Sequence, residues 1–278
     1  MNMAKPRNIP FSRLQQISDT GVFVKRFGQF GKTTMKPYAH RDDYYIMVLL
    51  TEGEASVEID FERSVLKTGD MLIISPWQVH NKPNGEIWDA DGWMLAFSSE
   101  ILTETEARII EEYSVSPTPF RPDGEAVKEI DALCAMTERN IRNRAIAIAL
   151  ASAVKSIALA SLDVPERRAA GRYRAITLRL RKLLKVHLKE EKRPAAYAEM
   201  LNISEVYLNE AVKGATGLSA GAYIRSLVMT QARRQLTCTS LSSKEIAYKL
   251  GYDDYVYFSK LFKKNTGKSP SEYRKNLN

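Results

Sequence analysis

The chain has 278 residues, with 41 Lys and Arg against 33 Asp and Glu, which gives a formal net charge of +8. Its hydrophobic content of 44% and charged content of 27% are typical of a soluble globular protein with one large or two ordinary domains. No run of 18 apolar residues exists, and the first residues lack the apolar core of a secretory signal. Cys134 and Cys238 form no C-x-x-C pattern, which argues against a disulfide framework or a thiolate zinc site. We therefore expect a cytoplasmic protein that does not associate with membranes.

The positive charge is concentrated in the C-terminal part of the sequence. Residues 172–278 hold 21 Lys and Arg against 9 Asp and Glu, a net of +12, whereas residues 1–171 carry a net of −4. A surplus of this size is the electrostatic footprint of a protein that binds a polyanion. A solvated basic surface that serves solubility explains the charge equally well, so charge alone leaves both interpretations open.

The first third of the chain has the apolar–polar alternation of strands. Val57, Ile59 and Phe61 fall on one face of such an alternation, and acidic residues fall on the other. Short strands at about ten-residue spacing, separated by turns rich in Gly, Pro and Asp, predict an antiparallel sandwich or barrel. The expected strands are 44–50, 55–62, 71–74 and 93–97, with turns at 51–54 and 68–70.

Helical periodicity begins near residue 100. It predicts helices over 101–114, 123–140 and 142–162. The third is apolar on most of its circumference, so it either lies inside the monomer or packs on a second copy of itself. A short polar stretch with Pro and Gly follows and predicts an interdomain linker over 163–173. From there to the C-terminus the sequence is typical of an all-helical domain.

One segment of this C-terminal domain has the pattern of a helix-turn-helix. The spacing predicts a short helix over 243–250, and Gly251 stands where a left-handed residue would end it. Asp253 or Asp254 can then cap the next helix, because a carboxylate accepts hydrogen bonds from the free N–H groups of a first turn. A helix, a glycine turn and a capped helix within about twenty residues predict this motif.

A second copy of the pattern lies about fifty residues earlier. Pro194 begins a short helix, Asn202 lies in the turn, and Ser204 is placed to cap a helix over 205–213. A continuous amphipathic helix over 220–236 connects the two copies. One such match is a weak signal, but two in tandem within the basic part of the chain predict a DNA-binding domain.

The outward positions of each second helix are the candidate DNA contacts, since this helix enters the major groove. Glu205 and Glu210 would repel phosphates, so we expect the first reading helix to bind less strongly than the second. The candidate DNA-binding residues are Val206, Asn209, Glu210, Lys213, Tyr255, Val256, Ser259, Lys260, Lys263 and Lys264.

Over residues 174–277 the sequence resembles the DNA-binding domain of the AraC/XylS family of transcription regulators. The motifs that carry the resemblance are Gly217–Arg225, Ile246–Tyr252, Tyr257–Lys264 and Gly267–Arg274. The resemblance implies a seven-helix domain that places two recognition helices in successive major grooves of one DNA face.

The N-terminal strands resemble the cupin-like effector domain of many members of that family. The matching residues are His40, Asp42, the segment Gly69–Pro76 and His80. Metal-dependent cupins usually have His where Asp42 stands, followed by a Glu that has no clear counterpart here. We therefore expect no metal and no cofactor, and interpret these residues as polar groups that line a barrel or bond a turn. The alternative is a facial triad of His40, Asp42 and His80 of the kind that binds ferrous iron.

A small-molecule effector in the barrel mouth is the preferred hypothesis for this domain. The candidate wall residues are Tyr44, Tyr45, Trp77, His80, Trp88 and Trp93.

Together these features predict a two-domain α+β protein. Residues 1–162 form a cupin-like effector-binding and dimerisation domain with trailing helices, 163–173 a linker, and 174–278 a tandem helix-turn-helix domain. We expect a sequence-specific, ligand-responsive transcription activator with no catalytic residues. Its expected partners are double-stranded DNA, RNA polymerase, a small-molecule effector and a second copy of the chain. The alternatives are a metal-dependent cupin enzyme with a DNA-binding appendix, and a non-specific architectural DNA binder.

Overall fold

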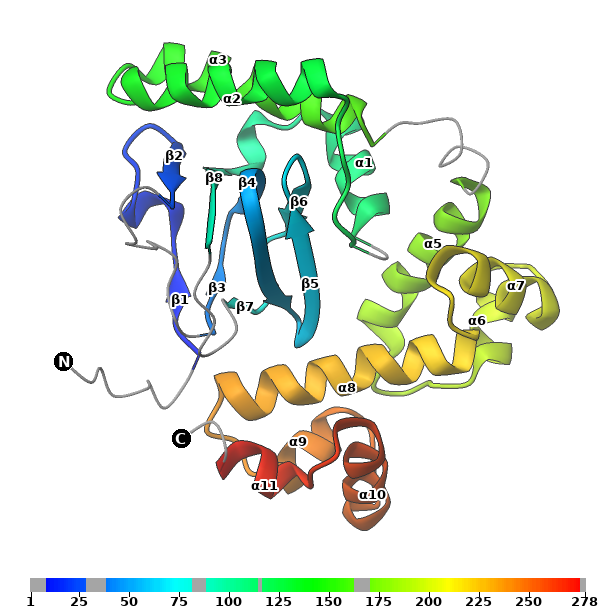
Figure 1. Cartoon of the computed structure of the whole chain (residues 1–278). Coiled ribbons are helices and arrows are strands. Elements are labelled where there is room, and N and C mark those ends of the chain that lie inside the picture. The colour runs from blue at the N-terminus through cyan, green and yellow to red at the C-terminus, as the bar shows by residue number, and fades with distance from the viewer. Residues whose placement is uncertain (1–8, 29–38, 82–88, 115–116, 163–170, 276–278) are drawn as a thin grey trace. The chain divides into compact units, whose positions relative to one another are not determined.

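The computed structural model describes residues 9–28, 39–81, 89–114, 117–162 and 171–275. The chain divides into two compact units, Phe11–Arg168 and Ala169–Asn278, the second of which also includes Met1–Pro10. Strands are confined to the first unit, and the second is helical throughout its described part (Figure 1). This confirms the predicted α+β class with a sheet-containing first half and an all-helical second half. Among the described residues, no helix is long and apolar enough to span a membrane.

Most of the predicted linker, residues 163–170, lies outside the described residues. The helical unit begins with α5 (Gly171–His187). The described residues of the extreme N-terminus group with this unit rather than with the sheet, and the backbone N–H of Ile9 donates to the carbonyl oxygen of Thr237 at 3.0 Å. The domain boundaries predicted from the sequence had placed this N-terminal segment with the sheet.

A six-stranded antiparallel sheet forms the centre of the first unit. Its strand order is β2–β8–β4–β5, and β6 and β7 also pair with β4, so β4 is the strand on which the sheet is built (Figure 1). A separate parallel pair joins two short strands, β1 and β3. The strands are β1 (Phe11–Ser12), β2 (Val22–Phe27), β3 (Arg41–Asp42), β4 (Tyr45–Ile59), β5 (Glu62–Lys67), β6 (Met71–Ile74), β7 (His80–Asn81) and β8 (Asp89–Phe97).

Strand β4 corrects one prediction. The turn expected at 51–54 is absent, because β4 continues through it with an irregularity in its pairing to β8 between Leu50 and Glu52. The chain reverses at Asp60 and Phe61 instead, whose φ angles of 52° and 71° are those of a two-residue type I′ hairpin turn. Phe61 therefore lies in a turn and does not belong to the alternating strand. The predicted strands at 71–74 and 93–97 are confirmed.

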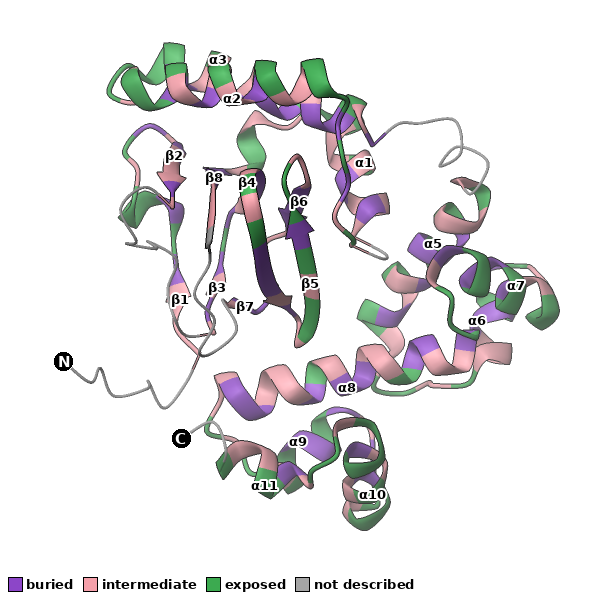
Figure 2. Cartoon of the chain, in the orientation of Figure 1, coloured by how far each residue is buried: buried purple, intermediate pink, exposed green. Residues whose placement is uncertain are grey.

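Three helices pack against the sheet and confirm the predicted helical segments. They are α1 (Glu104–Tyr113), α2 (Gly124–Arg139) and α3 (Arg144–Ala160), and the short 3₁₀ helix η3 (Ser99–Ile101) precedes them. Buried residues of all three helices join the buried strand residues in one hydrophobic core (Figure 2). Cys134 of α2 belongs to this core, and burial raises the pKa of its thiol to about 12. Both cysteines are free, as predicted.

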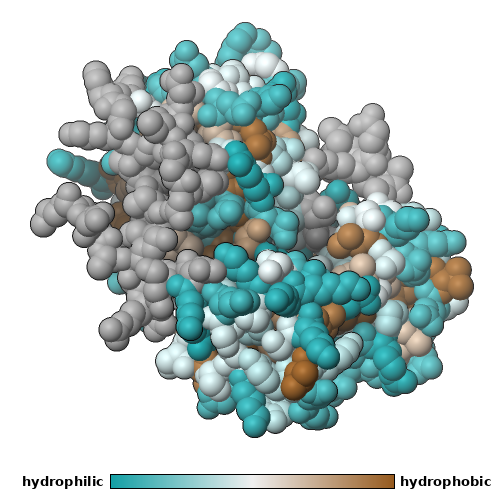
Figure 3. All heavy atoms as spheres, turned by 60° about the horizontal axis from the view of Figure 1, so that its bottom comes forward, coloured by the Kyte–Doolittle hydropathy of each residue, from teal (hydrophilic) through white to brown (hydrophobic). Residues whose placement is uncertain are grey.

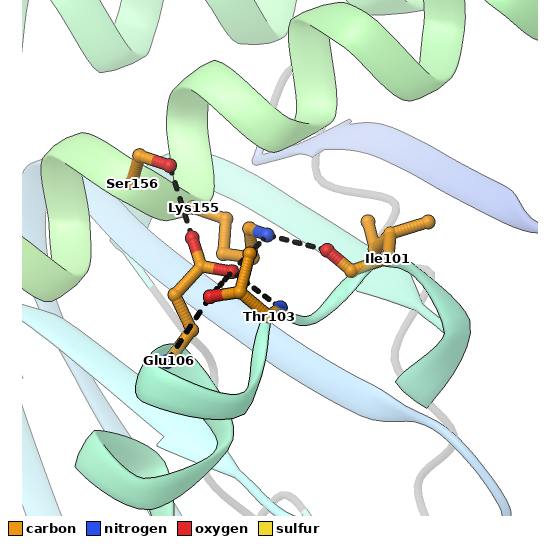
Figure 4. A network of polar contacts seen from close by, with 5 residues as sticks. All are labelled: Ile101, Thr103, Glu106, Lys155 and Ser156. Carbon is orange, nitrogen blue, oxygen red and sulfur yellow. Dashed lines mark hydrogen bonds and ion pairs between the residues drawn. The ribbon is translucent and has the colours of Figure 1, made fainter.

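A buried lysine joins α3 to α1 (Figure 4). The ammonium of Lys155 donates to a carboxylate oxygen of Glu106 at 2.6 Å and to the carbonyl oxygen of Ile101 at 2.5 Å. Burial alone raises the pKa of Glu106, but the Lys155 ammonium together with the N–H and hydroxyl of Thr103 lowers it below its ordinary value. The Lys155 side chain is only 3% exposed, so these partners replace the water contacts that its ammonium loses on burial.

Lys155→Met should destabilise the sheet-containing unit by about 3 kcal/mol, because it leaves the Glu106 carboxylate partly buried without its cation. Lys128→Met is the matched control, since the Lys128–Glu125 pair is exposed on α2, and it should change stability by less than about 0.5 kcal/mol. Urea unfolding followed by tryptophan fluorescence measures both variants, because all three tryptophans precede residue 94.

The same pair gives a pH dependence of defined sign. The folded pKa of Glu106 lies below its ordinary value of 4.5, so its charge stabilises the fold above that pH. The stability advantage of the wild type over Glu106→Gln should therefore shrink as the pH falls through the lowered pKa. An advantage that grows on acidification would contradict this assignment.

Seven α-helices make up the described part of the second unit. They are α5, α6 (Pro194–Met200), α7 (Glu205–Thr216), α8 (Ala220–Cys238), α9 (Ser243–Lys249), α10 (Tyr255–Thr266) and α11 (Pro270–Lys275). Two hydrophobic cores lie within this unit, one around α6 and α7 and the other around α9 and α10. The N-terminal half of α8 belongs to the first core through Tyr223 and Ile224, and its C-terminal half belongs to the second through Met229 and Leu236.

Candidate nucleic-acid interface

The helix pairs α6–α7 and α9–α10 are two helix-turn-helix units with the same turn geometry. In each, the residue after the C-cap has a positive φ, 54° at Asn202 and 76° at Gly251. In each, the next backbone N–H returns to the first helix, from Ile203 to the carbonyl of Ala198 and from Tyr252 to the carbonyl of Ala247, both at 3.0 Å. These bonds occupy carbonyls that a helix end would otherwise leave free. The two motifs predicted from the sequence are confirmed as helix-turn-helix structures.

The second helix of each unit begins and ends alike. The hydroxyl of Ser204 accepts from the N–H of Tyr207, and the carboxylate of Asp254 accepts from the N–H groups of Val256 and Tyr257. Each helix ends at a left-handed glycine, Gly217 or Gly267, twelve residues after its first residue. Thus α7 and α10 are equivalent elements, fifty residues apart, and both predicted caps form.

Equivalent inner positions anchor these helices in their cores. Leu208 and Val212 of α7 correspond to Phe258 and Phe262 of α10, and all four side chains are fully buried. The i,i+4 spacing places each pair on one helix face, so the opposite face is available to solvent. Each recognition helix therefore has its orientation set by a pair of buried side chains.

The opposite face carries most of the predicted DNA contacts. Val206 of α7 and Val256 of α10 are equivalent positions next to the caps and are 70% and 59% exposed. Tyr255 and Ser259 are only half exposed, and Tyr255 packs against the second core. The predicted contact residues that are exposed are Val206, Asn209, Glu210, Lys213, Val256, Lys260, Lys263 and Lys264.

Two residues on these faces differ from what the sequence indicated. The side-chain oxygen of Asn209 accepts from the N–H of Ala220 at 3.0 Å, so it holds the start of α8 against α7. Its two amide N–H groups and one lone pair of the oxygen remain for a base. Tyr257 was not among the candidates, yet it is 57% exposed beside Lys260 on the outer face of α10. Its i,i+3 spacing to Lys260 was the signal that could have identified it.

The charges on the two recognition helices are unequal. The exposed charged residues of α7 are Glu205, Glu210 and Lys213, whereas those of α10 are Lys260, Lys263 and Lys264. Lysines attract backbone phosphates and carboxylates repel them. The structure thus places a weakly acidic face on α7 and a strongly basic face on α10, which supports the expectation that the second helix binds DNA more strongly.

Further positive charge surrounds a cavity of about 410 Å³ among α5, α8 and α9. Its basic lining residues are Arg181, Lys185, Lys189, Arg234 and Lys249. Seen from the side of α9, α10 and α11, the surface of the helical unit is mostly hydrophilic, with hydrophobic residues only scattered over it (Figure 3). Such a surface suits a polyanion better than an apolar partner.

A close backbone approach joins the loop after α5 to the second helix-turn-helix. A Cβ atom on Gly251 would overlap the carbonyl oxygen of Lys189. The ammonium of Lys192 donates to the carbonyl oxygen of Gly251 at 3.1 Å and lies 4.8 Å from the ring centre of Tyr252. The turn that positions α10 is therefore held by a segment that leads into α6 of the first motif.

Gly251→Ala should destabilise the helical unit by at least about 3 kcal/mol, because strain from the positive φ adds to the overlap with Lys189. Gly217→Ala is the matched control: its φ is 75°, but nothing lies within 4 Å of an added Cβ. It should cost about 1 kcal/mol. Far-UV circular dichroism follows the helical unit, and tryptophan fluorescence, which reports the other unit, should not change. Equal losses for the two variants would contradict the importance of the Lys189 contact.

The sheet-containing unit holds a buried polar cluster of His40, Asp42, Tyr44 and His80. The Nε2 atom of His80 lies 3.2 Å from a carboxylate oxygen of Asp42, and that of His40 lies 3.8 Å from the same oxygen. Tyr44 hydrogen-bonds to Asp42, and its burial together with the Asp42 charge raises its pKa well above the ordinary value. The structure thus brings together the three residues of the alternative metal triad.

The candidate effector-pocket residues do not all lie together. Tyr44 and His80 meet at Asp42, and the N–H of Trp77 donates to the Asp42 carbonyl oxygen at 2.8 Å. Tyr45 instead stacks on Phe97. The indole N–H of Trp93 donates to Asp131 of α2 at 2.6 Å, so this ring points to the helix layer. Trp88 lies outside the described residues.

Two family models match the chain. The model for the AraC-like ligand binding domain matches residues 28–154, and a model for a helix-turn-helix domain matches residues 197–276. Together the two segments cover most of the chain and correspond to the sheet-containing and helical units.

Curated relatives match over a shorter segment. The Msm operon regulatory protein of Streptococcus mutans is 39% identical over 80 residues, 29% of each chain. The HTH-type transcriptional activator RhaS of Salmonella schwarzengrund is 35% identical over 91 residues, 33% of each chain. The arabinose operon regulatory protein of Escherichia coli is 32% identical over 80 residues, 29% of this chain and 27% of that protein. The chain therefore matches about a third of the length of these relatives.

One solved structure aligns over nearly the whole chain, and another aligns over about a third of it. ToxT from Vibrio cholerae O395 aligns over 92% of this chain and 97% of its own, with a TM-score of 0.43 and 13% identity. The C-terminal domain of AraT from Geobacillus stearothermophilus aligns over 36% of this chain and 84% of its own, with a TM-score of 0.34 and 34% identity.

Proposed function

This chain belongs to the AraC/XylS family of transcription regulators, and on that premise we propose that it is a ligand-responsive regulator that binds specific DNA sequences. The observation that carries the proposal is the pair of equivalent recognition helices, each capped, anchored and exposed in the same way. The two recognition helices, α7 and α10, are joined by α8. This arrangement favours binding to the bases of one continuous duplex site over binding to phosphates alone.

The length of the connecting helix supports reading in two successive major grooves. Helix α8 has 19 residues, which corresponds to about 28 Å at 1.5 Å per residue. Successive major grooves on one DNA face are about 34 Å apart. Because α8 contributes to both hydrophobic cores, it can hold two recognition helices at a fixed separation of this order.

In this proposal the sheet-containing unit is a cupin-like sensor for a small-molecule effector, which agrees with the ligand-binding family model over residues 28–154. The regulator works in the cytoplasm and contacts RNA polymerase. It acts as an activator rather than a repressor, which the similarity to RhaS, named a transcriptional activator, supports. We assign it no catalytic activity. Of the candidate wall residues near Asp42, Tyr44 and Trp77 are the proposed effector contacts.

The defining experiment is selection of bound fragments from genomic DNA, followed by affinity measurements on a selected duplex and a random duplex over a range of salt concentrations. A sequence-specific regulator keeps a large affinity ratio between the two duplexes as salt rises, although both affinities fall. A non-specific architectural binder loses both affinities together, and that result would refute the proposal.

On the selected duplex, Lys260→Ala should lower the affinity at least fivefold, which corresponds to about 1 kcal/mol for a lost base or phosphate contact. Glu210→Ala, at the equivalent position of α7, should leave affinity unchanged or raise it because it removes a negative charge. Lys128→Ala, exposed on α2 of the other unit, is the control and should have no effect. A larger loss for Glu210→Ala than for Lys260→Ala would show that α7 is the stronger reader.

We also propose that α3 mediates a homodimer. One face of α3 packs into the core, but a second apolar stripe of Ile146, Ala149, Leu150 and Ala153 is exposed or half exposed. No charged residue occurs between Arg144 and Lys155. A helix face in contact with water normally carries charged or polar residues, so this stripe fits a surface that a second copy covers.

Ile146→Glu should convert a dimer into a monomer without loss of fold, because Ile146 is already 42% exposed in the monomer. Val65→Glu is the control, since Val65 of β5 is similarly exposed at 39% and lies off the stripe. Sedimentation velocity at about 10 µM protein reports the assembly state. A wild type that sediments as a monomer at that concentration would exclude the dimer.

A further inference from the structure

Two backbone segments hold His40 and His80 in fixed positions opposite each other. The N–H of His40 donates to the carbonyl oxygen of His80 at 3.0 Å, and the N–H of His80 donates to that of His40 at 2.9 Å. His80 also pairs with Ile59 of β4 as part of the six-stranded sheet. The two side chains are thus built on the rigid part of the unit, which is what a preorganised site requires.

Both imidazole rings point to the carboxylate of Asp42. The exposed fractions of the three side chains are 8% for His40, 2% for Asp42 and 2% for His80, so the cluster is shielded from water. Each residue offers one ligand atom, and these three atoms lie within 4.8 Å of one another. Zinc–ligand distances of 2.0–2.2 Å in a tetrahedral site separate neighbouring ligand atoms by about 3.3–3.6 Å. The observed separations of 3.2 Å and 3.8 Å to Asp42 fall on either side of that range.

The hydrogen bond made by Nδ1 of His80 determines which of its two ring nitrogens has a free lone pair. Its Nδ1 atom lies 3.1 Å from the carbonyl oxygen of Gln78, which can only accept, so Nδ1 carries the proton and donates. In the neutral ring, Nε2 then presents a lone pair, and this fully buried atom has no hydrogen-bond partner. It lies 3.2 Å from a carboxylate oxygen of Asp42, so the two atoms are close enough to bind one cation.

The surroundings are those of a metal ligand set. Histidines that bind a metal usually donate their other ring N–H to a backbone carbonyl, as His80 does to Gln78, and ligating carboxylates are hydrogen-bonded in turn, as Asp42 is to Tyr44. Two imidazole nitrogens and one carboxylate oxygen suit divalent first-row transition metals rather than Mg²⁺ or Ca²⁺, which prefer oxygen ligands.

We propose that His40, Asp42 and His80 bind one divalent transition-metal ion in the sheet-containing unit. The three protein ligands leave at least one coordination position open, as in sites that take a further ligand. This proposal takes up the alternative stated from the sequence, a triad of His40, Asp42 and His80, in place of the expectation of no metal. The proposal does not depend on DNA binding, because it rests on contacts within one unit.

The test uses the untagged full-length chain after removal of metal with a chelator and dialysis. Titration calorimetry with Zn²⁺ should show one site per chain, and Co²⁺ should produce the visible absorption of a nitrogen- and oxygen-ligated ion. Asp42→Asn, which keeps the size of the side chain, and His80→Ala should each weaken Zn²⁺ binding at least about 100-fold, because each removes one of three ligands.

His187→Ala is the matched control, since His187 is the remaining histidine of the chain and lies on α5 of the other unit. It should bind Zn²⁺ as the wild type does. Thermal unfolding provides a second measurement: Zn²⁺ should raise the unfolding temperature of the wild type and of His187→Ala but not that of Asp42→Asn. The proposal is overturned if the chelator-treated wild type binds no Zn²⁺, or if Asp42→Asn binds it as tightly as the wild type.

Discussion

A single helix, α8, belongs to two hydrophobic cores at once, and the arrangement of the helical unit depends on this. Tyr223 and Ile224 pack with α6 and α7, and Met229 and Leu236 pack with α9 and α10. Each helix-turn-helix therefore shares its hydrophobic core with part of this helix. The separation of α7 and α10 is therefore a consequence of core packing and not of a flexible connection.

A second connection reinforces the first. The loop after α5 contacts the turn of the second motif through Lys189 and Lys192, which meet the backbone of Gly251. Helix α8 and this loop thus join the two helix-turn-helix units through two separate sets of contacts. The outer faces of this pair carry unequal charge, acidic on α7 and basic on α10. In the proposed complex, α10 would therefore bind DNA more strongly than α7.

Much of the helical unit was predictable because its signals are local. The caps Ser204 and Asp254 and the left-handed Gly217 and Gly267 act on groups within four residues of themselves, so their chemistry can be recognised in the sequence. The sheet was less predictable. Strand β4 passes through the expected turn at 51–54 because β8, which is distant in sequence, pairs with residues 52–54, and that constraint leaves no local signature.

The sequence by itself determined the two-domain class, the tandem motifs, the buried faces of α7 and α10 and the uneven charge of the chain, since all of these follow from residue type and short-range spacing. Only the tertiary structure decided that the Asn209 oxygen is occupied by the start of α8. It alone decided that His40, Asp42 and His80 converge. The physical reason is that these contacts join residues from different elements, whose distances depend on how whole elements pack and not on the order of residues within any one of them.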